Sequence, residues 1–177
     1  GVDVQNLVVM DLQNAAFPVM VNRSLGQAQV QEIQAVNYPY FVDVRPDMMD
    51  DDNLIVSGLP AISMNWASPV QLNEAKNQNR ETSVLMTSSS SSWTSSSTII
   101  QPDFDLYPEV GFAISESQTS YPLAVAIQGS FDSFFKDKPI PTVTVTEEEN
   151  QPTQPLTTIN KSSAEGRLVV FGSSGFV

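Results

Sequence analysis

Small polar residues follow three apolar stretches of the sequence, at the points where predicted strands end. If these strands are parallel neighbours in an open α/β sheet, their hydroxyls and free backbone N–H groups converge on one polar binding site beyond the carboxyl ends. Trp93 would suit a sugar there, because its ring can stack on a sugar face while hydroxyls bond to it. Turn statistics favour the alternative, in which these are ordinary turn residues. The candidate ligand-binding residues are Thr87, Ser88, Ser89, Trp93, Ser130, Ser173 and Ser174.

The chain contains no Cys and no His. This excludes a Cys nucleophile, a thiolate or imidazole metal site, and a Ser-His-Asp triad within the chain. Gly172-Ser-Ser-Gly175 does not have the spacing of a nucleophile elbow. Lys161 beside Ser162 lies in a polar segment, where a protonated Lys is a poor base. We therefore assign no catalytic residue, and a hydrolase that uses Ser or carboxylates at strand ends (Asp11 and Asp43) remains the less favoured alternative.

Four aspartates, at positions 47, 50, 51 and 52, precede Asn53. Oxygen ligands at this density suit Ca²⁺, but the spacing is not that of an EF-hand loop and the required Gly is missing. A solvated acidic loop is the favoured interpretation. We predict neither a metal site nor a cofactor.

The chain has 177 residues, a hydrophobic fraction of 41% and a formal net charge of −12. This length and composition suit one domain with a core of its own. Such an acidic chain repels phosphate backbones and anionic lipid surfaces, so we expect no nucleic-acid partner. No run of 18 or more apolar residues occurs. Because the chain starts at Gly1 and ends directly after a strand-like run, we expect an excised fragment whose membrane segments lie outside it.

Several stretches have strand-like patterns. Residues 26–36 fit a helix or a strand, and we favour the extended form. Residues 73–81 are polar and indicate a turn or an exposed loop. Pro18 indicates that residues 17–21 form either a strand at a sheet edge or an irregular extension. The remaining strands are expected within residues 6–11, 38–44, 59–70, 84–86, 112–114, 121–128 and 167–171.

Residues 136–163 differ from the rest in composition. They include four prolines, several threonines and the acidic run at positions 147–149. A stretch of this length without periodicity indicates a long loop within the single domain, residues 1–177. Val143 and Val145 alternate with Thr, which allows a short edge strand there.

An ordered set of segments resembles one family, the GldG-like auxiliary components of ABC-type transport systems associated with gliding motility. The similarity extends over nearly the whole chain. The segments are Leu-Val-Val-Met-Asp (7–11), Tyr-Pro-Tyr-Phe-Val (38–42), Trp-Ala-Ser-Pro-Val (66–70), Val-Leu-Met-Thr-Ser-Ser (84–89) with Trp93, residues 121–131 and residues 166–176.

The resemblance implies an extracytoplasmic domain, anchored in the full-length protein by a membrane helix outside this fragment. It implies the ABC permease and ATPase subunits of the same system as partners. It also implies a Rossmann-like fold similar to glutamine amidotransferases, without that activity, since the required Cys and His are absent. We therefore predict a β-rich α/β domain with a mixed, mostly parallel sheet.

The predicted function is that of a non-catalytic accessory domain that binds a partner protein or a polar ligand such as a carbohydrate. A second alternative, besides the hydrolase, is a structural surface domain that self-associates through edge strands and the long loop.

Overall fold

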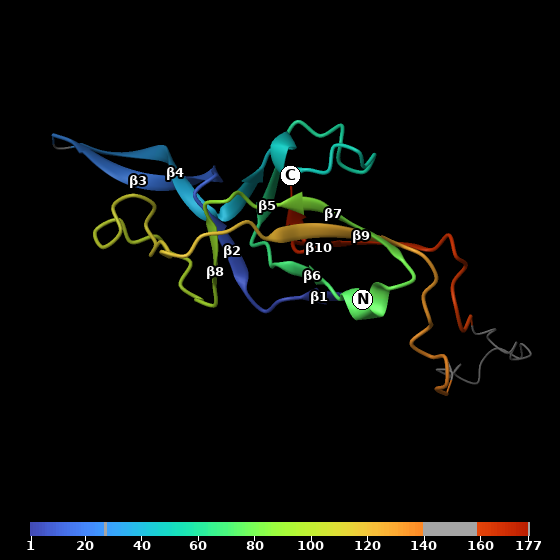
Figure 1. Ribbon diagram of the computed structural model, residues 1–177. Coiled ribbons are helices and arrows are strands. Elements are labelled where there is room, and N and C mark those ends of the chain that lie inside the picture. Colours follow the sequence, from blue (N-terminus) through green and yellow to red (C-terminus); the bar gives the residue numbers. More distant parts are fainter. Residues whose placement is uncertain (27, 140–158, 177) are drawn as a thin grey trace, which may run out of the picture.

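The computed structural model describes residues 1–26, 28–139 and 159–176, and strands dominate them (Figure 1). All strand pairings in this part of the chain are antiparallel and form four small sheets. Helical structure in the same residues is limited to the 3₁₀ turn Pro46–Met48 and to α1 (Glu74–Asn77), which is a single turn. The predicted mostly parallel, Rossmann-like (glutamine-amidotransferase-like) α/β sheet is therefore wrong.

The physical reason lies in the connections between strands. Neighbouring parallel strands need a crossover of a dozen residues or more, usually a helix, and α1 is too short to be one. The continuous apolar runs that indicated parallel strands have another cause here. In β2 and β9 they belong to strands of small sheets that pack on one another, so both faces of these two strands are covered, while the run in β10 is largely exposed.

The four sheets, without one projecting hairpin, form the part of the molecule that we call the body. A three-stranded sheet, in the order β10-β9-β7, forms one half of it. Its central strand is β9 (Pro122–Gln128), in which Leu123, Ala124 and Val125 are fully buried. The neighbours are β7 (Glu81–Thr87) and β10 (Arg167–Phe171).

A four-stranded sheet, in the order β11-β5-β4-β3, forms the other half. It contains β3 (Asn14–Leu25), β4 (Ala28–Val44), β5 (Ile62–Asn65) and β11 (Gly175–Phe176). Phe176 of β11 stacks on Phe171 of β10, with ring centroids 5.0 Å apart. The end of the chain therefore links the two larger sheets.

Two further strand pairs complete the body. Strand β1 (Val2–Val4) pairs with β6 (Val70–Leu72), and β2 (Val8–Asp11) pairs with β8 (Ser92–Ser95). Strand β8 lies inside the Ser-rich stretch, where the sequence did not indicate a strand. Its register places Trp93 opposite Met10 and Ser92 opposite Asp11.

The main core lies where β2, β4, β5, β7 and β9 meet. Buried side chains from all five strands contact one another there, together with Val56 from the β4–β5 connection. Burial of apolar surface is the main source of stability in such a core, at about 25 cal/mol per Å². Its members are Val9, Val42, Val44, Val56, Ile62, Met64, Ala67, Leu85, Met86, Leu123 and Ala124.

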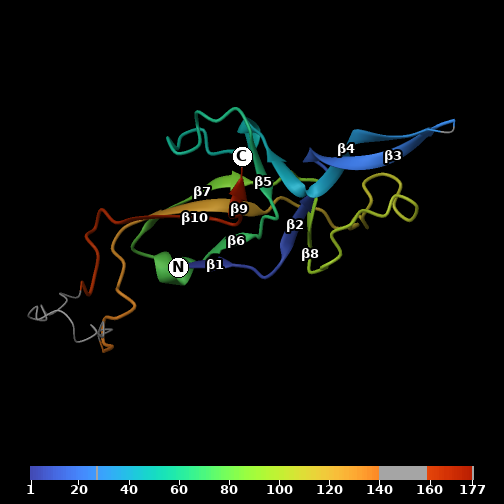
Figure 2. The ribbon, with the colours of Figure 1, turned by 180° about the vertical axis from the view of Figure 1, so that it is seen from behind.

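Strands β3 and β4 extend beyond the body as a long hairpin, which we call the arm (Figures 1 and 2). The arm comprises the paired residues from Ala16 opposite Asn37 to Leu25 opposite Ala28. At about 3.4 Å per residue it is roughly 30 Å long. Gly26 at its tip has φ +64°, a left-handed conformation that tight hairpin turns require and Gly adopts easily. Strand β5 pairs with β4 only at residues 41–44, so the arm is a two-stranded ribbon.

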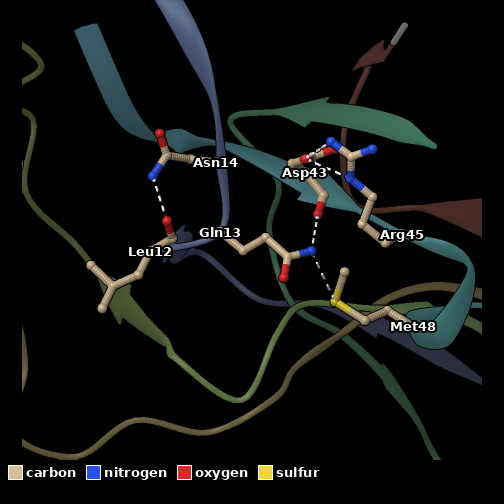
Figure 3. A network of polar contacts seen from close by, with 6 residues as sticks. All are labelled: Leu12, Gln13, Asn14, Asp43, Arg45 and Met48. Carbon is tan, nitrogen blue, oxygen red and sulfur yellow. Dashed lines mark hydrogen bonds and ion pairs between the residues drawn. The ribbon is translucent and has the colours of Figure 1, made fainter.

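A polar network fixes the base of the arm (Figure 3). The side-chain amide of Gln13 donates to the Asp43 carbonyl oxygen at 2.8 Å and approaches Met48 Sδ at 3.9 Å. Asn14 donates to the carbonyl oxygens of Asp11 and Leu12, and its own side-chain oxygen accepts from the Tyr38 N–H. Because these bonds connect β2, β3 and β4, the direction in which the arm leaves the body is set.

Most of the predicted strands are confirmed: those within residues 6–11, 17–21, 84–86, 121–128 and 167–171. The extended interpretation of residues 26–36 is confirmed for residues 28–36, which continue with residues 38–44 as one strand, β4, while Gly26 belongs to the turn. The strand at residues 59–70 is shorter than expected, and residues 112–114 form no strand. The polar stretch 73–81 contains α1, capped by the Asn73 side chain. The possible edge strand at Val143 and Val145 lies outside the described residues.

Gly172 lies just after β10, where the backbone comes very close to the backbone of two other segments. Its N–H donates to the Leu123 carbonyl oxygen and its carbonyl oxygen accepts from the Ser68 N–H, both at 2.8 Å. A Cβ atom at this position would collide with the Ser68 carbonyl oxygen. Only glycine fits here without a backbone shift.

We expect Gly172→Ala to lower the free energy of unfolding by about 2 kcal/mol or more, because the added methyl group must displace backbone atoms. Urea unfolding measures this change. The matched control is Gly58→Ala, where the added Cβ has no neighbour within 4 Å among the described residues. An equal effect of the two substitutions would contradict the close-approach explanation.

Candidate functional site

The hydroxyl groups at the end of β7, which we predicted to bind a ligand, form hydrogen bonds with other groups of the protein. Ser88 is 1% exposed, and its Oγ shares a 2.5 Å hydrogen bond with Ser92 Oγ and accepts from the Tyr121 N–H. Ser89 donates through Oγ and N–H to the two carboxylate oxygens of Asp11, at 2.5 and 2.8 Å. The Thr87 hydroxyl donates to the Met48 carbonyl oxygen at 3.5 Å. These groups hold the β7–β8 turn against the end of β2.

The three predicted strand ends do not all converge, because β9 is antiparallel to both of its neighbours. Met86 and Phe171 both pair with Ala124, so the carboxyl ends of β7 and β10 lie at one end of β9. Ser130 lies at the opposite end, where its hydroxyl donates to the Ser162 carbonyl oxygen. The prediction that these three strands are parallel neighbours is therefore wrong. That the individual residues bind a ligand stays a prediction.

Ser173 and Ser174 come directly after β10, the edge strand that pairs with β9. The Ser173 hydroxyl donates to the Asn65 carbonyl oxygen at 2.5 Å, while Ser174 is exposed. The carboxylates considered as an acid and base pair have separate partners. Asp11 accepts from Ser89 and Gln13, and Asp43 pairs with Arg45. A hydroxyl or carboxylate with such partners is a structural link between segments.

The acidic loop after β4 brings three carboxylates together. Asp50, Asp51 and Asp52 place their ligand oxygens within 4.8 Å of one another, and the last two residues are exposed. A solvated Asp-rich loop produces the same grouping, so no metal role follows from it.

A cleft of about 450 Å³ lies over β2, β4 and β8. Its volume falls within the range of small-molecule sites. Met10, Tyr40 and Trp93 contribute from the three strands, and residues 97–115 cover them. Trp93 is thus the predicted site residue that lines a cavity. It is 4% exposed and belongs to a second buried cluster with Met10, Tyr38, Tyr40 and Phe112.

The loop that covers the cleft is folded on itself. Asp103 Oδ1 accepts from the N–H groups of Asp105 and Leu106, at 3.1 and 3.0 Å. The Asp103 N–H donates to the Gly111 carbonyl oxygen, and the Gly111 N–H donates to the Tyr107 carbonyl oxygen, both at 2.8 Å. The side chain of Asp103 organises a local turn in this way, as an Asp commonly does.

Two tyrosines of β4 attach this loop to the body. Tyr38 Oη donates to the Ile100 carbonyl oxygen at 2.8 Å, and Tyr40 Oη donates to the Ile99 carbonyl oxygen at 3.2 Å. Burial, together with the neighbouring Tyr40, raises the pKa of Tyr38 to about 12. Burial also raises the pKa of Tyr40, against a lowering hydrogen bond from Ser95.

An aromatic cluster continues from the cleft to the base of the arm. Tyr40 meets Phe112 edge-on at 5.2 Å on the cleft side, and Trp66 stacks on Tyr40 at 4.5 Å. Tyr38 meets Phe17 and Phe41 at 5.2 and 4.9 Å. Trp66 has φ +55°, which is unusual for a bulky residue, and its N–H donates to the Tyr40 carbonyl oxygen. Aromatic pairs of this kind contribute about 0.5–1.5 kcal/mol each beyond their buried area.

Sequence reasoning identified Trp93 but missed most of the cleft. Residues 103–111 have no helix or strand pattern in the sequence, because their order comes from turn hydrogen bonds, which have no periodicity. Tyr38 and Tyr40 carried a usable signal. Residues two apart on a strand share a face, so their hydroxyls must reach a common neighbour.

We expect stability to fall as the pH rises from about 10 to about 12. An unfolded Tyr ionises near 10, whereas Tyr38 in the folded protein ionises near 12, so the stabilisation is complete below pH 10 and is lost through this interval. Tyr38→Phe should make the decline shallower and cost about 1 kcal/mol at neutral pH through the lost hydrogen bond. Urea unfolding at a series of pH values measures both effects. An unchanged decline in Tyr38→Phe, relative to the exposed-site control Tyr107→Phe, would refute this explanation.

In the part of the chain that the structure describes, no helix is long and apolar enough to cross a membrane. Comparison with curated proteins finds no match, and comparison with solved structures finds none either. A family model described as "ABC-type uncharacterized transport system" matches residues 1–177. The match spans the cleft, the arm and the core strands alike. The chain therefore belongs to this family of auxiliary components of ABC-type transport systems.

Proposed function

We propose that this chain is a non-catalytic, extracytoplasmic accessory domain that binds the permease of its ABC-type transport system through the arm. Membership in the family supports a role beside transporter subunits. The extracytoplasmic side follows from the resemblance to GldG-like components, and on that side the permease, not the ATPase, is within reach. The exposed arm is the observation that carries the proposal.

The arm offers apolar surface that the fold itself does not use. Met20 and Ile33 lie opposite each other on one face and are 75% and 72% exposed. On the other face Val30 is 41% exposed, while Phe17 packs against Tyr38 and Phe41 at the base of the arm. Apolar side chains gathered on a projecting element indicate a contact with another molecule.

The charge distribution distinguishes the arm from the body. Residues 14–40 contain one Arg and one Glu, so the arm carries no net charge, while the chain as a whole carries −12. Two copies of the body repel each other, and a lipid surface would need basic residues, which the arm lacks apart from Arg23. An uncharged, apolar protein surface suits the arm best.

The fixed base makes the arm a suitable binding element. The network of Gln13, Asn14 and Asp43 (Figure 3) holds its direction before any partner is bound. The backbone N–H and the ring of Tyr38 add further contacts there. Less conformational entropy is then lost on binding. A non-catalytic role is supported by the absence of Cys and His and by the engagement of Ser88, Ser89 and Asp11 in internal hydrogen bonds.

We expect the double substitution Met20→Glu/Ile33→Glu in the full-length protein to abolish co-purification with the permease of the same system. Two carboxylates would have to be desolvated at the contact, which costs several kcal/mol. The matched control is Leu54→Glu/Phe134→Glu, which adds the same charge at body positions that are 96% and 73% exposed.

Both double variants should stay folded, because all four positions are exposed, and the arm variant should unfold at a slightly lower temperature, because its two carboxylates lie directly opposite each other. Retention of the permease by the arm variant would refute the proposal. Concentration-dependent light scattering that disappears only in the arm variant would favour self-association instead.

A second candidate function is the binding of a polar ligand such as a carbohydrate in the cleft. The observation in its favour is that Trp93, Thr94 and Ser95 line the same cavity, so a ring and hydroxyls lie together. We expect a glycan array to give specific binding that Trp93→Phe weakens about tenfold. Phe keeps the ring in the core, which Ala would leave with a cavity costing about 3–5 kcal/mol. The absence of any glycan signal from the folded protein would dismiss the carbohydrate.

A further inference from the structure

We propose that the ligand of the cleft is an organic cation with apolar substituents, of the quaternary ammonium class. This inference rests on the ligand-binding part of the proposed function and is independent of the arm. It names a ligand class that differs from the carbohydrate predicted from the sequence.

Four aromatic residues line the cleft. Tyr40 and Trp93 come from strands of the body, and Tyr107 and Phe112 come from the covering loop. The Tyr40 hydroxyl is bonded to the Ile99 carbonyl oxygen and its ring packs against Trp66 and Phe112, so a cation would contact Trp93 and Tyr107 rather than Tyr40. Ring faces attract cations through their quadrupole, and a group of rings is the usual receptor for a quaternary ammonium.

The cleft also provides a carboxylate. Asp103 is the only lining residue with a formal charge among the described residues. Its Oδ1 accepts two backbone N–H groups, whereas Oδ2 accepts no hydrogen bond from any described residue. An exposed carboxylate among the lining residues of a cleft that also contains aromatic residues favours a cation over an anion.

The surrounding segment strengthens this preference. No Lys or Arg occurs between Arg80 and Lys136, while Asp105, Glu109 and Glu116 lie in or next to the covering loop. The potential at the cleft is therefore negative, which raises the local concentration of cations. A neutral sugar gains nothing from this field, so the charge favours the cation over the carbohydrate.

The test uses choline and its neutral isostere, neohexyl alcohol, in which a carbon atom replaces the nitrogen. Titration calorimetry, with Trp fluorescence as a second readout, should show choline binding at least about tenfold more tightly than the alcohol. Equal affinities, or no choline binding by the folded protein, would overturn the proposal. Glycan binding without choline binding would also overturn it and would leave the carbohydrate in place.

Two variants distinguish a direct contact between the cation and Asp103 from the general attraction of the negatively charged loop. Asp103→Asn keeps an oxygen for the two backbone N–H groups and removes the charge, and it should weaken choline binding about tenfold. Asp105→Asn removes the same charge from the same loop at a residue that does not line the cleft, and it should change the affinity less than about twofold. Equal effects of the two variants would overturn the contact with Asp103.

Both variants are checked by thermal unfolding, since an unfolded variant would lose binding for another reason. Loss of permease binding in the arm variant together with intact choline binding would support both proposals separately. Intact permease binding in that variant would refute the proposal that the arm binds the permease and would leave the proposal for the cleft unaffected.

Discussion

The buried carboxylate of Asp11 connects the turn that leads into β8 with the base of the arm. It is fully shielded from solvent, and its two oxygens accept from Ser89 Oγ, the Ser89 N–H and the Gln13 N–H. A buried charge is tolerated only when such bonds satisfy it, and each bond to a charged group contributes about 1.5–3 kcal/mol. Through Ser89 the carboxylate positions the turn that leads into β8 and Trp93, and through Gln13 it positions the start of the arm. The cleft and the arm therefore depend on the same carboxylate group, that of Asp11.

The strands could be predicted to a large extent because each carries its own local signal. Val8, Val9 and Met10 form an apolar run, as do Leu123 to Ile127, and both runs lie in strands. The way these strands associate could not be predicted. Burial of both faces fits a central strand of a parallel sheet and also a strand between two small sheets, and the apolar runs themselves do not distinguish the two. The absence of long amphipathic helical stretches was the better indicator, because parallel strands need crossover helices.

The site could be predicted only in part, for a related reason. Trp93 stood out by its residue type in a Ser-rich stretch, and it does line the cleft. The hydroxyls around it suggested recognition, yet Ser88 and Ser89 act inside the protein as hydrogen-bonding links. A hydroxyl offered to a ligand and one bonded to a backbone carbonyl have the same sequence signature. Asp103 and Tyr107 were missed because their positions depend on a turn and on distant tyrosine hydroxyls.

Strand β4 has one further property, which follows from its length. It holds the covering loop through Tyr38 and Tyr40, and it continues without interruption into the arm. A partner on the arm and a ligand under the loop would therefore both act on one continuous strand. If either changes the affinity for the other, thermodynamic linkage requires the two effects to be equal in free energy.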